Sequence, residues 1–192
     1  MDDTALLIER LLATALLPLW LLAGGADALC HRVQRIEATA GVRESLLHWL
    51  MLFELGTGIL AVLLLEVNAG VLALALVACI AHELTTWCDL AYAASRRRIP
   101  PYEQWVHGLQ EVLPWAAWVS LAMAHHAQAA SLWPSAWPAA DWALRWKAEP
   151  LPLGFIAAVV AAAGLLVVLP LGAELWRCLR AARPHGGAPG RA

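Results

Sequence analysis

The apolar residues of this chain gather in five long segments, which are separated by short polar or proline-containing stretches. A helix needs roughly 20 mostly apolar residues to cross the hydrocarbon core of a bilayer. The pattern predicts five transmembrane helices, over about residues 4–31, 44–65, 71–94, 101–128 and 153–177. Proline suits the first position of a helix, so we expect the fourth to begin near Pro101. Residues 1–180 then form one transmembrane domain, and the Gly-, Pro- and Ala-rich tail, residues 181–192, is expected to be disordered and cytoplasmic.

Basic residues in the connecting segments predict the orientation of these helices. Of the 13 basic residues, ten arginines fall on one side of the five-span layout. The three on the other side are Arg10, Arg145 and Lys147. Because positively charged loops face the cytoplasm, we expect the N-terminus outside and the C-terminus in the cytoplasm. The expected location is a bacterial inner membrane.

The composition agrees with a membrane protein. Hydrophobic residues make up 61% of the 192 residues, charged residues make up 15%, and the mean hydropathy is +0.62. Soluble domains contain about 25% charged residues, so a soluble enzyme, a disordered chain and a secreted disulfide scaffold are excluded. The net charge of −2 offers no basic surface for nucleic acid. The expected partner is therefore membrane lipid, and the Trp-rich segment 130–150 is interpreted as an anchor on the headgroups or a lid over an entrance.

Ionisable residues lie inside the predicted membrane helices, where they are costly and usually functional. Each of the first four helices contributes one histidine and at least one carboxylate to this set. These residues are Asp27 and His31; Glu44, His48 and Glu54; His82, Glu83 and Asp89; and Glu103, His107 and Glu111. Three of the acid–histidine pairs are four residues apart, which places both side chains on one helical face. At about 1.5 Å of rise per residue, the antiparallel layout brings the set to one level.

We therefore expect an all-α integral membrane protein in which the first four helices form an antiparallel four-helix bundle around a buried cluster of histidines and carboxylates. The fifth helix carries only Glu174 near its inner end and is expected to be a supporting helix.

Bound cations would offset the cost of so many polar groups in a dry place. Imidazole mixed with carboxylate suits iron, manganese or zinc, and two ions that share carboxylates would use the whole set. The expected cofactors are two transition-metal ions, with iron favoured and manganese or zinc as alternatives. The predicted metal ligands are Asp27, His31, Glu44, His48, His82, Glu83, Asp89, Glu103, His107 and Glu111. Glu54 and Glu111 are the predicted catalytic carboxylates, and Glu111 is interpreted as a bridging ligand or proton carrier.

Soluble di-iron carboxylate bundles offer a chemical analogy, although their Glu-x-x-His spacing is one residue shorter than the spacing here. The favoured function is a non-haem di-iron oxidoreductase that uses O2 on a lipophilic small-molecule substrate. An external electron donor is required, because the chain has no flavin or iron–sulfur motif. Three alternatives remain. They are a transporter or channel for metal ions or protons, a haem b protein with two histidine ligands, and a purely structural polar cluster.

Overall fold

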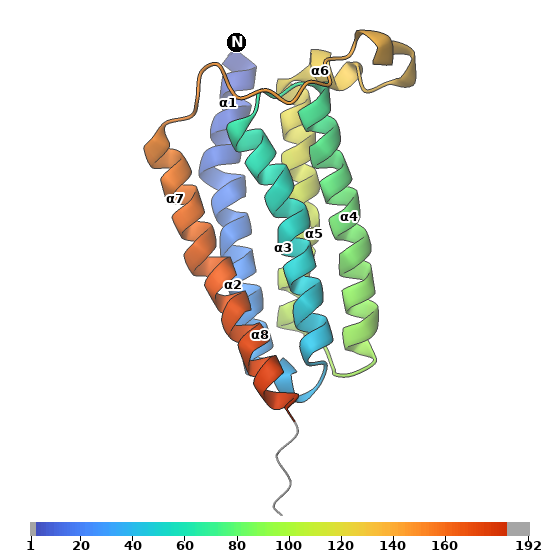
Figure 1. Ribbon diagram of the computed structural model, residues 1–192, viewed down its shortest axis with the longest axis vertical. Helices are drawn as coiled ribbons and strands as arrows, with labels where there is room; N and C mark the ends of the chain where they lie inside the picture. Colours follow the sequence, from blue (N-terminus) through green and yellow to red (C-terminus); the bar gives the residue numbers. More distant parts are fainter. Residues whose placement is uncertain (1–2, 184–192) are drawn as a thin grey trace, which may run out of the picture.

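The computed structural model describes residues 3–183, and these residues fold into long helices joined by short connections (Figure 1). The first long helix is continuous through α1 (Asp3–Leu11), the π-helical η1 (Leu12–Leu16) and α2 (Leu17–Gln34). The next three are α3 (Val42–Leu64), α4 (Ala69–Ala94) and α5 (Pro101–Ala124). The last comprises α7 (Leu153–Ala163), the π-helical η4 (Gly164–Val168) and α8 (Leu169–Ala181). Short helices η2 (Ile36–Ala38), α6 (His126–Ala130) and η3 (Pro134–Ala139) lie in the connections. Beyond Arg183 the predicted tail lies outside the described residues.

Among residues 3–183, four helices are long and apolar enough to span a membrane: Asp3–Gln34, Val42–Leu64, Ala69–Ala94 and Leu153–Ala181. The helix α5 has 24 residues but does not reach the same apolarity, because Glu103, His107 and Glu111 interrupt it. Large apolar side chains such as Leu84 and Met123 point outward and are exposed, as expected of surfaces that face lipid. Residues 3–183 are therefore all-helical, with four helices that could span a membrane.

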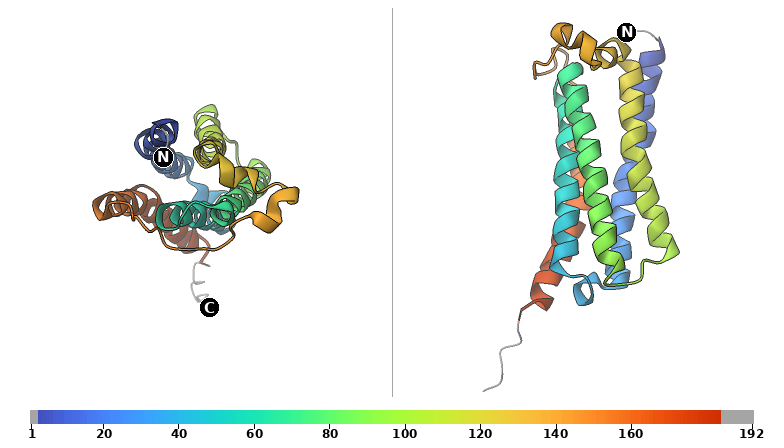
Figure 2. Two further views of the ribbon diagram at one scale, coloured as in Figure 1. Left: turned by 90° about the horizontal axis from the view of Figure 1, so that it is seen from above. Right: turned by 90° about the vertical axis from the view of Figure 1, so that its right-hand side faces the viewer.

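The long helices run alternately up and down and pack as two pairs (Figures 1 and 2). The most extensive contact joins α3 to α4, and the first long helix packs on α5. Near one end of the molecule, α8 contacts both α2 and α3. Gly25 permits close approach there, because a Cβ at this position would lie 3.3 Å from the Leu166 carbonyl oxygen of η4.

Prolines set the irregular parts of three helices. A proline has no N–H, so the carbonyl four residues before it loses its helical partner. For Pro18 and Pro170 these carbonyls belong to Thr14 and Leu166, and both lie in the π-helical segments. A local widening into π-helix is a common response to an interrupted hydrogen-bond ladder. In α5, Pro114 leaves the Gln110 carbonyl without its helical donor in the same way.

Residues 126–152, here called the cap, cover the end of the bundle at which the N-terminus lies (Figure 2). The cap is attached to the turn between α3 and α4 through its backbone. Glu66 N donates to the Arg145 carbonyl at 2.9 Å, and Lys147 N donates to the Leu64 carbonyl at 3.0 Å. Asn68 Nδ2 adds a hydrogen bond of 2.7 Å to the Ala143 carbonyl. The cap is therefore fastened to the bundle at this turn.

Gly70 tests how firmly the cap is attached. A Cβ at Gly70 would lie 2.7 Å from the Trp142 carbonyl oxygen, so Gly70→Ala should push the cap away from α4 and destabilise the protein by about 1–3 kcal/mol. Gly56→Ala is the matched control, because no atom lies within 4 Å of its Cβ position in the middle of α3. Thermal unfolding in detergent should show a lower midpoint for Gly70→Ala and an unchanged or higher one for Gly56→Ala. Equal midpoints would contradict the attachment.

Candidate metal centre

Two stacked histidines and one carboxylate form the middle of the buried cluster. The rings of His31 on α2 and His48 on α3 are parallel within 8°, and their centroids lie 4.3 Å apart. The two carboxylate oxygens of Glu174 on α8 lie 3.0 Å from His31 Nδ1 and 2.9 Å from His48 Nδ1. An ionised carboxylate only accepts hydrogen bonds, so both rings carry a proton on Nδ1 in this arrangement. In the neutral rings, Nε2 then keeps a free lone pair, as in carboxylate–histidine–metal arrangements.

These Nε2 atoms face further carboxylates. His31 Nε2 lies 3.4 Å from Asp27 Oδ1 and 3.6 Å from Glu103 Oε1. His107 Nε2, on α5, lies 3.0 Å from the same Asp27 oxygen and 3.9 Å from the same Glu103 oxygen. On the other side of the stacked rings, His48 Nε2 lies 3.5 Å from Asp89 Oδ2.

Several of these atoms are buried without a hydrogen bond. Among the described residues, Asp27 Oδ1, His31 Nε2 and His48 Nε2 have no hydrogen-bond partner. Buried polar atoms are nearly always hydrogen-bonded, so each exception calls for an explanation. Two ligands of one metal ion, each about 2.0–2.2 Å from it, lie about 3–3.5 Å apart. The shortest separations in the cluster match this spacing.

Two overlapping groups of buried residues can therefore hold a metal ion. One comprises Asp27, His31 and His107, and the other comprises His31, Glu44 and His48. Within each group the candidate ligand atoms lie within 4.8 Å of one another. His31 belongs to both groups, so it lies at the centre of the donor set.

Arg97, in the turn after α4, closes the end of the cluster. Its Nη2 donates to Glu44 Oε1 at 2.6 Å, and its Nη1 donates to Glu103 Oε2 at 3.0 Å. Burial by itself would lower the pKa of Arg97, but Glu103 and Glu44 raise that pKa above its usual value. The guanidinium therefore stays charged and balances part of the carboxylate charge.

The structure brings seven of the predicted site residues together: Asp27, His31, Glu44, His48, Asp89, Glu103 and His107. Among the described residues, four others form no ion pair with this cluster and belong to neither candidate group: Glu54, His82, Glu83 and Glu111. Glu54 accepts a hydrogen bond of 2.8 Å from Thr85, and Glu83 accepts one of 3.2 Å from Trp115. These hydrogen bonds satisfy carboxylate oxygens between neighbouring helices.

Helical drift explains the placement of Glu111. Each step of four residues turns about 40° past a full rotation, so Glu111 is rotated by about 80° from Glu103 although both seem to continue one stripe. Glu111 lines a surface hollow between α4 and α5 together with Glu83. His82 lies on the buried face of α4, seven residues before Asp89, and is 6% exposed.

The sequence analysis missed the roles of two residues. Glu174 lies at the centre of the cluster, so the fifth helix does not only support the bundle but supplies a carboxylate to it. Its signal was its position as the one ionisable residue in an otherwise apolar stretch. Arg97 carried no signal that separated it from Arg96 and Arg98.

Comparison of the chain with protein-family models, with curated proteins and with solved structures finds no match. The functional assignment therefore rests on the geometry of the cluster.

Arg97 provides a test of the cluster's charge balance. Arg97→Met should destabilise the protein by about 3–5 kcal/mol, because it leaves two fully buried carboxylates without their cation. Arg98→Met removes the same charge from an exposed position in the same turn and should change stability little. Denaturant or thermal unfolding of both variants checks this expectation, and similar loss in both would contradict it.

Proposed function

We propose that this chain is a membrane-embedded, metal-dependent oxidoreductase that acts on a lipophilic substrate. The observation that carries the proposal is the set of buried ligand atoms that lie at ligand–ligand spacing without a hydrogen bond, above all Asp27 Oδ1, His31 Nε2 and His48 Nε2.

The charge of the cluster supports two metal ions. Five buried carboxylates and one guanidinium carry a net charge of minus four when the histidines are neutral: Asp27, Glu44, Asp89, Glu103, Glu174 and Arg97. Two divalent cations would neutralise this charge. Asp27, His31, Glu103 and His107 would hold one ion, and His48, Asp89 and Glu44 would hold the other. Iron is favoured for this mixed donor set, with manganese or zinc as alternatives.

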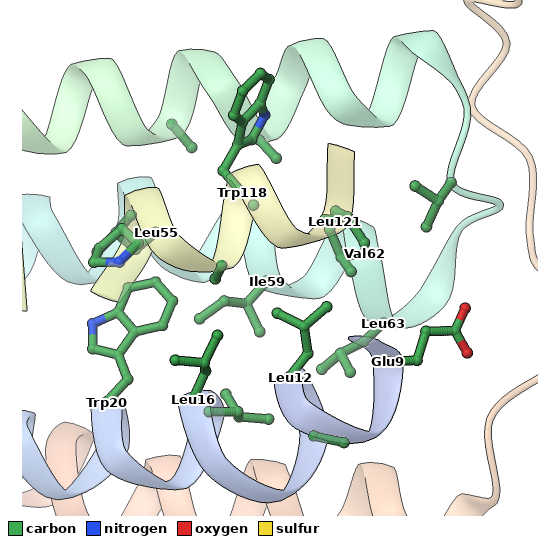
Figure 3. Close-up of a pocket in the computed structure, with 18 of the residues that line it drawn as sticks. Glu9, Leu12, Leu16, Trp20, Leu55, Ile59, Val62, Leu63, Trp118 and Leu121 are labelled. Carbon is green, nitrogen blue, oxygen red and sulfur yellow. The ribbon is translucent and has the colours of Figure 1, made fainter. Parts of the chain in front are cut away.

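Bound iron would supply one-electron chemistry and O2 activation, with electrons from an external donor. The chain's own residues orient the donors. Glu174 fixes the rings of His31 and His48 through Nδ1, and Arg97 holds Glu44 and Glu103. The lipophilic substrate class is supported by an apolar pocket between the helices, on the cap side of the cluster (Figure 3).

The alternatives fit these contacts less well. An ion transporter needs a polar path beyond the cluster, whereas the pocket wall is mainly apolar. A haem needs an open slot between its axial ligands, and His31 and His48 stack on each other and share Glu174. A purely structural cluster would be expected to satisfy its buried donors and acceptors.

The proposed arrangement has five membrane spans. The helix α4 ends at the end of the molecule opposite the cap, and α7 begins at the capped end (Figure 1). If both helices span the membrane, the chain between them must cross it once, and α5 provides that crossing. The charge asymmetry of the connections then puts the cap outside and the turn that contains Arg97 in the cytoplasm.

Cysteine labelling tests this orientation. Ser135→Cys, in the cap, should react with a membrane-impermeant maleimide in intact spheroplasts. Ser95→Cys, in the turn between α4 and α5, should react only after permeabilisation, and the unsubstituted chain gives the background. The reverse pattern would overturn the orientation, and accessibility of both sites in intact spheroplasts would overturn the five spans.

Metal content tests the proposed centre. The protein, purified without a metal-affinity tag, should contain iron at up to two ions per chain by elemental analysis. Glu174→Gln, which changes a residue that orients ligands, should lower the metal affinity about 10–100-fold. His107→Ala removes a proposed ligand and should lower the metal affinity by more than that. His126→Ala, exposed in the cap, is the matched control.

Full metal content in the His48→Ala/His107→Ala double variant, or a wild-type protein that binds no metal, would contradict the proposal. A haem absorption band in the optical spectrum would favour the haem alternative.

A further inference from the structure

The pocket has a volume of about 240 Å³ and lies between the two helix pairs. For comparison, an engineered cavity of about 150 Å³ binds benzene. Its walls are apolar side chains from the first long helix, α3, α4 and α5, including Leu16, Trp20, Leu55 and Leu121 (Figure 3). The polar residues Glu9, His125 and Lys147 line it only at the capped end. The pocket therefore resembles a lipophile site with a polar rim.

The inner end of the pocket is in helical register with the cluster. On each of three helices, a pocket residue lies seven positions from a cluster residue. These pairs are Trp20 and Asp27, Leu55 and His48, and Pro114 and His107. Seven residues make almost two turns, which keeps both side chains on one face and separates them by about 10 Å. The pocket therefore ends about two turns from the candidate metal centre.

His82 lies at the level between them on α4. Cys79, three residues before it, lines the pocket, and Asp89, seven residues after it, belongs to the cluster. His82 is 6% exposed, and both of its ring nitrogens lack hydrogen bonds within residues 3–183. The pocket lining stops at Cys79 and does not include His82, so His82 lies in the protein between the inner end of the pocket and the cluster.

The rim indicates the charge of a ligand in this pocket. Glu9 and Lys147 carry opposite charges, and His125 Nε2 lies 4.0 Å from Glu9 Oε1. The rim therefore offers hydrogen-bond donors and acceptors but no net charge. Such a rim suits an uncharged hydroxyl or carbonyl head group better than a phosphate or a carboxylate.

We infer that the pocket binds an elongated, uncharged lipophile whose polar group lies at the rim of Glu9, His125 and Lys147 and whose apolar end lies at the inner end of the pocket, near Trp20 and Cys79. That this molecule is the substrate rests on the proposed function. Its binding in the pocket does not.

Photolabelling tests the inference with two long-chain alkanols, one with a diazirine at the chain end and one with a diazirine beside the hydroxyl. Protein in lipid nanodiscs is irradiated, and adducts are mapped by mass spectrometry. The chain-end probe should label residues near Trp20 and Cys79 saturably, and the other probe should label residues near Glu9 and Leu12. Ala117→Phe places a large side chain in the wall and so fills part of the pocket, which should reduce both adducts several-fold. Met123→Phe, on the exposed face of the same helix, should not.

Equal labelling in Ala117→Phe and Met123→Phe, or the reverse order of adducts for the two probes, would overturn the inference. Labelling of the same wall by a diazirine on a phospholipid acyl chain, without competition from the alkanol, would assign the pocket to bilayer lipid and would also overturn it. Metal content of the same samples separates the two proposals. Bound metal without saturable labelling would support the metal centre and overturn the lipophile site. Saturable labelling without bound metal would support the lipophile site and overturn the metal centre.

Discussion

The burial of five carboxylates at one end of a largely apolar bundle is the constraint on which the rest of this structure depends. Each ionised carboxylate costs several kcal/mol to bury unless a positive group or hydrogen bonds offset that cost. Arg97 donates hydrogen bonds to Glu44 and Glu103, and the Nδ1–H groups of His31 and His48 donate to Glu174. Asp27 Oδ1 and Asp89 Oδ1 remain without hydrogen bonds, and the nearest cationic partners of these two carboxylates are imidazoles, so a bound cation could offset the remaining charge.

The same residues hold the two helix pairs together. Glu174 on α8 joins α2 to α3 through their histidines, and Arg97 joins α3 to α5 through Glu44 and Glu103. Toward the capped end, the pocket lies between these pairs, and the backbone hydrogen bonds of the cap hold the turn between α3 and α4. Polar contacts therefore fasten both ends, and the apolar pocket lies between them.

Local periodicity explains which parts could be predicted from the sequence. Hydropathy indicates the helices, and spacings of four or seven residues place Asp27, His31 and His107 on inner faces. Glu111 does not lie with Glu103 in the cluster, because two steps of four residues rotate its side chain away from that of Glu103. Glu174 and Arg97 depend on how the last helix and a turn fold back onto the bundle. No local period encodes such tertiary contacts. The polarity of α5 follows in part from Glu103 and His107, so α5 is less apolar than the four helices that could span a membrane.

Close helix packing also restricts how a substrate could approach the centre. The small residues of α2 do not leave a lateral opening, because Cβ atoms at Gly24 and Gly25 would meet Val167 and Leu166 of η4. Gly58 on α3 similarly packs against Ala78 on α4. The pocket, by contrast, lies along the bundle axis and ends within about two turns of the cluster. A lipophile bound along this axis with its polar group at the rim would have its apolar end nearest the cluster, about two turns of helix away from it.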